Sequence, residues 1–94
     1  MKIRLTFRAS QQLLSAYEYL QDVADSAAST QMKLIFDSID LLEKFPLAGR
    51  QGKVAGTREM VVPRTPFIVV YAIEADEVQI LSILHASRRW PKSF

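Results

Sequence analysis

The spacing of hydrophobic residues along this chain of 94 residues changes twice, and these changes limit the folds that it can adopt. Residues 2–7 alternate hydrophobic and polar side chains, which predicts a half-buried strand. Hydrophobic residues in 10–24 and in 27–44 then recur three and four positions apart, which predicts two amphipathic helices with a polar break at 25–26. Ser10 is the expected N-cap of the first helix.

Three further strands are predicted in the second half of the chain, over 57–62, 67–73 and 78–85. The run at 67–73 is hydrophobic on both faces, which favours a place in the middle of the sheet. The segment 46–56, which holds all three glycines, is expected to be a loop. The predicted fold is therefore α+β in the order β-α-α-β-β-β, with the two helices packed as a hairpin on one face of a sheet.

The composition is that of a folded protein, with 49% hydrophobic and 23% charged residues, and residues 1–94 are expected to form a single domain. Cysteine is absent, which excludes disulfides, thiolate zinc sites and cysteine nucleophiles. No hydrophobic run approaches the length of a membrane span, and the N-terminus lacks the apolar core of a signal peptide. We therefore expect a cytoplasmic protein.

The net charge is +2, but the charges are unevenly distributed. Acidic residues dominate 9–43 and 67–84, whereas basic residues dominate 1–8, 44–66 and 85–94. If the basic segments meet in space, they form a positive surface suited to phosphates or to an acidic partner. The other interpretation is a solvated surface of mixed charge.

One face of the sheet must stay uncovered, because two helices from one block of sequence can cover only the other. In the first strand, Ile3, Leu5 and Phe7 share one side, and Arg4 and Thr6 share the opposite side. We therefore expect Arg4 and Thr6 on the open face.

His85, the single histidine, ends the last predicted strand and shortly precedes Arg88 and Arg89. An imidazole beside two guanidiniums can accept a proton near neutral pH, although a structural histidine is the alternative. Trp90 either docks the C-terminal tail onto the domain or stacks on a nucleic-acid base. Phosphate-binding glycine loops and serine-hydrolase motifs are absent, and one histidine without cysteine argues against a metal site, so no cofactor is expected.

Four short strings, in this order and spacing, make the chain resemble the RelE/ParE superfamily of toxins from type II toxin–antitoxin modules. They are FPLAGR at 45–50, GTREMVV at 56–62, PFIVVY at 66–71 and ILHASRRWP at 83–91. The resemblance covers essentially the whole chain and implies a bacterial, cytoplasmic plasmid-stabilisation toxin with a twisted, mainly antiparallel sheet under the helical hairpin. It also implies a toxin–antitoxin hetero-oligomer, in which the extended C-terminal segment of a co-encoded antitoxin neutralises the toxin.

The resemblance leaves two mechanisms open. ParE-like members inhibit DNA gyrase and are not nucleases, whereas RelE-like members cleave messenger RNA on the ribosome without a metal. In the RelE-like case the catalytic residues here would be Arg58, His85, Arg88 and Arg89, gathered on the open face to move protons and stabilise the phosphorane. Whether the protein is an enzyme therefore depends on the branch.

The sequence slightly favours gyrase inhibition over RNA cleavage, because the chain lacks the C-terminal tyrosine and the dense lysines of some RelE-like members. A third possibility is a non-toxic homologue that only binds an antitoxin, through strand addition or helix docking. The residues expected to contact nucleic acid or the target are Arg4, Arg50, Lys53, Arg64 and Trp90.

Overall fold

A computed structural model describes residues 1–23, 25–87 and 91–94 of the chain. The elements are β1 (Lys2–Leu5), α1 (Phe7–Val23), α2 (Asp25–Lys44), β2 (Arg50–Gln51), β3 (Arg58–Val61), β4 (Phe67–Glu74) and β5 (Glu77–His85). The strands form one sheet in the order β1-β5-β4-β3-β2, in which β1 runs parallel to β5 and the other neighbours are antiparallel. The α+β class and the central place of β4 are confirmed, and so is the predicted element order except for the additional short strand β2.

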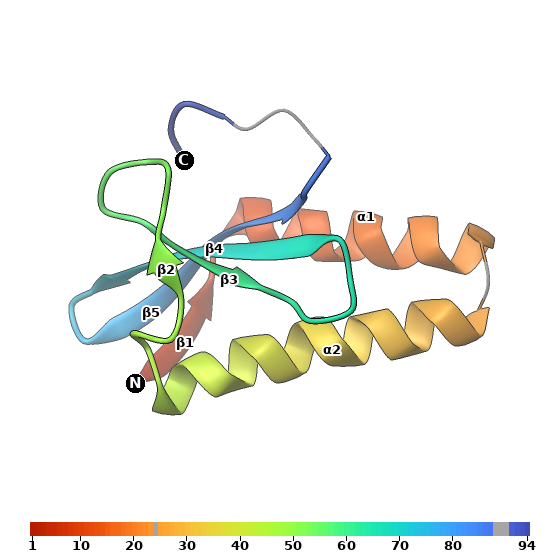
Figure 1. Cartoon of the computed structure of the whole chain (residues 1–94), viewed down its shortest axis with the longest axis horizontal. Helices are drawn as coiled ribbons and strands as arrows, with labels where there is room; N and C mark the ends of the chain where they lie inside the picture. The colour runs from red at the N-terminus through yellow and green to blue at the C-terminus, as the bar shows by residue number, and fades with distance from the viewer. Residues whose placement is uncertain (24, 88–90) are drawn as a thin grey trace.

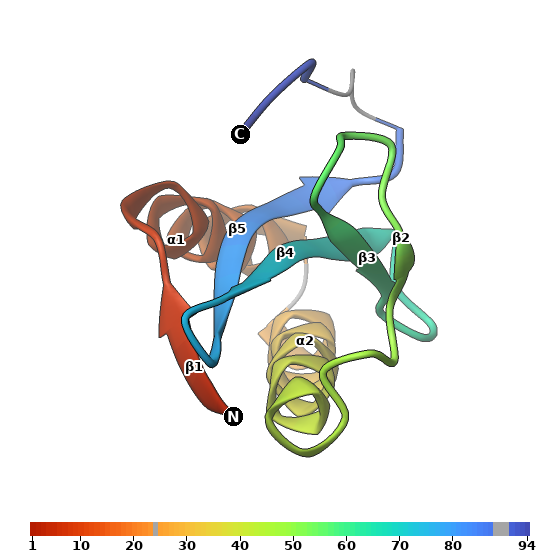
Figure 2. The same ribbon diagram turned by 90° about the vertical axis from the view of Figure 1, so that its left-hand side faces the viewer.

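Both helices lie on the same side of the sheet, and the C-terminal end of the chain lies on the side away from α2 (Figures 1 and 2). The main core is formed between the helices and one face of the sheet, where Ile35 and Leu42 of α2 share a cluster with Val69 and Tyr71 of β4. We call this side the helix face. The other side, the open face, carries a smaller cluster built around Ile68, Val70 and Leu84.

The first helix begins three residues earlier than predicted, and its N-cap is Thr6 rather than Ser10. The backbone N–H of Ala9 donates to Thr6 Oγ1 at 3.2 Å, and the Thr6 hydroxyl donates to the carbonyl oxygen of Ile80 at 2.9 Å. Thr6 therefore links the end of β1 to β5 and also caps the N-terminus of α1. Because the chain leaves the strand there, the expectation that Phe7 faces the core is wrong, and its side chain is 81% exposed.

The polar break predicted at 25–26 is wrong, because α2 already begins at Asp25, whereas its end at Lys44, two residues before Pro46, is as predicted. The remaining boundaries shift by at most two residues. Phe36 of α2 lies outside the buried side of the helix and is 47% exposed. The predicted loop 46–56 contains the short strand β2, which pairs with β3 through Arg50 opposite Glu59. Two residues are too few to show a periodicity in the sequence.

A β-bulge in β5 reverses the alternation of its side chains. Tyr71 of β4 pairs with Ile80 and Val70 pairs with Ser82, so Leu81 is the extra residue. Ile80 and Ile83 consequently both reach the core on the helix face, although simple alternation places them on opposite faces.

The first strand stops pairing with β5 at Ile80, and a side chain of α1 continues the hydrogen bonding. Gln12 Oε1 accepts hydrogen bonds from the backbone N–H of Ile83 at 2.7 Å and from the Ser82 hydroxyl at 2.8 Å. These bonds hold α1 against the C-terminal half of β5. Among the described residues, no helix is both long and apolar enough to cross a membrane.

Candidate functional site

Arg58 lies on the helix face, at the corner of the sheet where β3 begins. It stands opposite Tyr71, whose side chain is in the main core, and opposing residues of neighbouring strands point to the same side. Its Nη1 donates to the carbonyl oxygen of Gly49 at 2.8 Å. The guanidinium therefore fastens the segment that follows α2 to the sheet.

The Tyr71 hydroxyl completes this attachment. It accepts a hydrogen bond from the backbone N–H of Gly49 at 2.9 Å and donates one to the carbonyl oxygen of Pro46 at 2.7 Å. Burial raises the pKa of Tyr71, and the Gly49 N–H and the Arg58 charge oppose that rise. A Cβ atom at Gly49 would lie 2.6 Å from the Tyr71 hydroxyl oxygen, so this close approach requires glycine.

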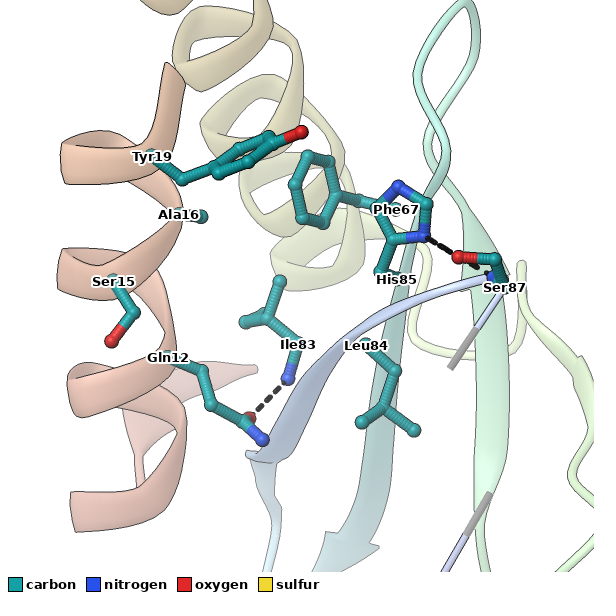
Figure 3. Close-up of a pocket in the computed structure, with 9 residues that line it drawn as sticks. All are labelled: Gln12, Ser15, Ala16, Tyr19, Phe67, Ile83, Leu84, His85 and Ser87. Carbon is teal, nitrogen blue, oxygen red and sulfur yellow. Dashed lines mark hydrogen bonds between the residues drawn. The ribbon is translucent and has the colours of Figure 1, made fainter. Parts of the chain in front are cut away.

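His85 lies at the other end of the helix face, opposite Phe67. Its ring meets the Phe67 ring edge-on, with centroids 5.6 Å apart and an interplanar angle of 81°. Its Nδ1 accepts a hydrogen bond from the backbone N–H of Ser87 at 3.2 Å and lies 2.6 Å from the Ser87 hydroxyl oxygen (Figure 3). An Nδ1 that accepts from a backbone amide carries no proton, so the ring proton lies on Nε2.

The expectation that folding gathers Arg58 and His85 on the uncovered surface is wrong. The two residues belong to strands on opposite sides of β4, opposite Tyr71 and Phe67 respectively, and both point to the helix face. Arg58 lines a hollow with the β2–β3 loop, whereas His85 lines a separate hollow against α1. The strand register causes this separation. The other two members of the predicted catalytic set, Arg88 and Arg89, lie outside the described residues, as does Trp90.

The open face carries a buried carboxylate that the sequence did not single out as a site. Glu59 is only 2% exposed, and its Oε1 accepts hydrogen bonds from Arg50 Nη2 at 3.1 Å and Arg50 Nε at 3.2 Å. Its Oε2 accepts a hydrogen bond from the backbone N–H of Lys53 at 2.8 Å. We call Glu59, Arg50 and Lys53 the carboxylate clamp. It fixes the β2–β3 loop, while the Arg50 side chain remains 60% exposed.

An apolar patch adjoins the carboxylate clamp, because Val70 of the smaller cluster lies opposite Glu59 in the β3–β4 pair. Phe94, close to the end of the chain, packs against this cluster. The half-exposed Val61 lies opposite Ile68 and extends the patch along β3. The open face thus combines a guanidinium with hydrophobic side chains, which is the composition of many protein-binding surfaces.

The remaining predicted contact residues are distributed around the molecule. Arg4 does not stand free, because its Nε donates to Glu77 Oε2 at 2.9 Å. That hydrogen bond lowers the pKa of Glu77 and raises the pKa of Arg4. Arg64 is exposed in the turn between β3 and β4, where its φ is +61°. The structure therefore brings together Arg50 and Lys53, but neither joins Arg4.

A strand, a helical hairpin and a mixed, mostly antiparallel sheet make up the fold that the RelE/ParE resemblance implies. The family model described as "ParE toxin of type II toxin-antitoxin system, parDE" matches residues 3–90, and the chain accordingly belongs to the ParE toxin family. The chain is 35% identical over 91 residues to a Sinorhizobium fredii protein named "Putative toxin Y4kP", covering 97% of this chain and 94% of that protein.

A solved structure titled "Chromosomal ParDE TA system from P. aeruginosa" has the same fold. Its similarity to this chain has a TM-score of 0.80 at 26% sequence identity, and it covers 90% of this chain and 95% of that one. The RelE/ParE resemblance seen in the four short strings is confirmed and narrowed to the ParE family.

Proposed function

We propose that this toxin acts by binding and inhibiting DNA gyrase, and not by cleaving RNA. The observation that carries the proposal is the separation of Arg58 from His85 on the helix face. A metal-independent nuclease needs a proton acceptor and a cation within reach of one phosphate. Here Arg58 donates a hydrogen bond to the Gly49 carbonyl oxygen, and His85 Nδ1 accepts one from the Ser87 backbone N–H. Each side chain therefore has a local structural partner. Membership of the ParE family supports the same choice.

The open face is the surface we propose for the target. Arginine beside exposed hydrophobic side chains is favoured at protein interfaces, and the carboxylate clamp holds Arg50 in place before binding. The half-exposed Val61 and Phe94, which packs over the buried cluster of the open face, supply the apolar part. Because gyrase works on the chromosome, we propose that the protein acts in the cytoplasm.

We further propose that a co-encoded antitoxin binds this chain and neutralises it in a hetero-oligomer. The similar Pseudomonas structure is titled as a ParDE toxin–antitoxin system, which supports an antitoxin partner here. An antitoxin that covers both Arg50 and the apolar patch would be only partly displaced by salt, because hydrophobic burial is not screened.

A supercoiling assay with purified chain and purified gyrase tests the target. We expect loss of supercoiling and accumulation of cleaved DNA. Arg50→Gln should weaken inhibition several-fold, because it removes an exposed charge beside the apolar part of the open face. Lys33→Gln, which removes an exposed charge from α2, should leave inhibition unchanged.

Messenger RNA in a translating extract provides the opposing readout. Messages should stay intact at a concentration of toxin that arrests growth. Unaltered supercoiling at excess toxin, together with new messenger ends that disappear in His85→Ala, would overturn gyrase as the target. A chain that arrests neither growth nor supercoiling would be an antitoxin-binding homologue without toxicity.

A further inference from the structure

A hollow of about 350 Å³ lies between α1 and the C-terminal end of β5, and the proposed gyrase contact does not use it. Phe67, Ile83 and Ala16 form its apolar wall, and Tyr19 reaches across from α1 toward Phe67 and His85 (Figure 3). Its size is at the lower end of the range for small-molecule sites, roughly 300–1,000 Å³. The hollow therefore suits a compact ligand of one ring.

The polar groups of the hollow are hydrogen-bond donors with capacity to spare. The His85 Nε2 carries the ring proton, because Nδ1 accepts from the Ser87 amide. The Gln12 carbonyl oxygen is occupied by Ser82 and Ile83, which leaves its NH₂ group to donate elsewhere. The Tyr19 hydroxyl lies on the side of the hollow where His85 stands (Figure 3), and its side chain is 64% exposed.

None of the described lining residues is an aspartate, glutamate, lysine or arginine. Among these described residues, a cationic ligand finds no counter-charge, and a doubly charged phosphate finds no cation to balance it. A carboxylate carries one charge on two acceptor oxygens, which neutral N–H and O–H donors can satisfy. A flat hydrocarbon ring matches the aromatic surfaces of Phe67 and Tyr19.

We propose that this hollow binds a small aromatic carboxylate, whose oxygens accept hydrogen bonds from the His85 Nε2 and the Tyr19 hydroxyl. The ring of the ligand packs against Phe67, and the Gln12 amide donates at the other end of the hollow. This site goes beyond gyrase inhibition and gives the toxin a small-molecule ligand of its own. Its location on the helix face separates it from the carboxylate clamp on the open face.

Titration of the isotope-labelled full chain with benzoate, followed by NMR, tests the site. We expect saturable shifts at the Ile83 amide, the Gln12 side-chain amide and the Tyr19 ring. Benzylammonium and inorganic phosphate are the controls, and neither should produce them. The absence of saturation with benzoate, or equal shifts with benzylammonium, would overturn the proposal.

Tyr19→Phe provides the sharper test, because it removes one hydroxyl from an exposed side chain and leaves the fold intact. Loss of a hydrogen bond to a charged group should weaken benzoate binding about tenfold. Tyr17→Phe, which removes an exposed hydroxyl elsewhere on α1, is the matched control and should bind as the natural chain does. Equal affinities for the two variants would rule out the Tyr19 contact. The titration contains no gyrase, so its outcome is independent of the proposed target.

Discussion

Glu59 and Arg50 face each other across the β2–β3 pair, and one carboxylate oxygen accepts both guanidinium hydrogen bonds at 3.1 and 3.2 Å. The other oxygen holds the Lys53 amide. A carboxylate this deeply buried is stable only when both of its oxygens are satisfied. The pair therefore explains how a short, glycine-containing hairpin keeps a defined shape on the open face.

Glu59→Gln should destabilise the protein by about 1–3 kcal/mol, because charge-assisted hydrogen bonds become weaker neutral ones. The denaturation midpoint in urea measures the loss, and hydrogen exchange at the Lys53 amide should accelerate at the same time. Glu18→Gln, at an exposed position of α1, is the control and should change neither quantity. Unchanged exchange at Lys53 in Glu59→Gln would contradict the carboxylate clamp.

Tyr71→Phe should cost about 1–3 kcal/mol, because it leaves the Gly49 amide and the Pro46 carbonyl without their buried partner. Thermal or urea unfolding measures the cost, and the Gly49 amide should exchange faster. Tyr17→Phe removes a hydroxyl whose hydrogen bond, from Gln21, lies at the exposed surface, and it should stay within about 0.5 kcal/mol of the natural chain. Equal stabilities of the two variants would show that the Tyr71 hydrogen bonds to the 46–50 segment do not contribute to the stability of the fold.

Thr6→Ala should destabilise the fold by about 1–2 kcal/mol, since it removes the N-cap of α1 and the hydroxyl bond to Ile80. Thr6→Ser, which keeps the hydroxyl, should restore most of that stability. Ser10→Ala should be close to neutral, because Ser10 lies inside the helix and not at its cap. The reverse ranking in urea unfolding would place the cap at Ser10.

The Arg4–Glu77 pair should make a small contribution to stability that depends on pH. The hydrogen bond from Arg4 lowers the pKa of Glu77 below its usual value of 4.5, so the folded state prefers the ionised carboxylate. The contribution is therefore present above pH 4.5 and is lost as the pH falls through the lowered pKa.

Urea midpoints of the natural chain and of Glu77→Gln, measured across the acidic range, test this prediction. The difference between them should be largest near neutrality and should vanish in strong acid. High salt should reduce it, because the pair lies at the surface, with the Arg4 side chain 59% exposed and the Glu77 side chain 23% exposed. A difference in urea midpoints that grows on acidification would contradict this prediction.

The site could be read from the sequence only in part. Arg50 was predicted to be a contact residue, and the structure places it opposite Glu59, whose side chain lies on the other side of β3 from Arg58. The sequence did not show which side of β3 the helices cover, and Glu59 was therefore not recognised as part of the carboxylate clamp. A carboxylate in a strand whose neighbours are buried is the signal that could have found it.

The sequence by itself determined the two helices, the four longer strands, their order and the family, because hydrophobic periodicity and short motifs are properties of neighbouring residues. Only the tertiary structure decided which faces meet. The Leu81 bulge reverses the side chains of β5, and the register with β4 sends Arg58 and His85 to opposite ends of the helix face. These features arise from pairings between strands, and the periodicity of a single strand carries no information about the residues that it will oppose.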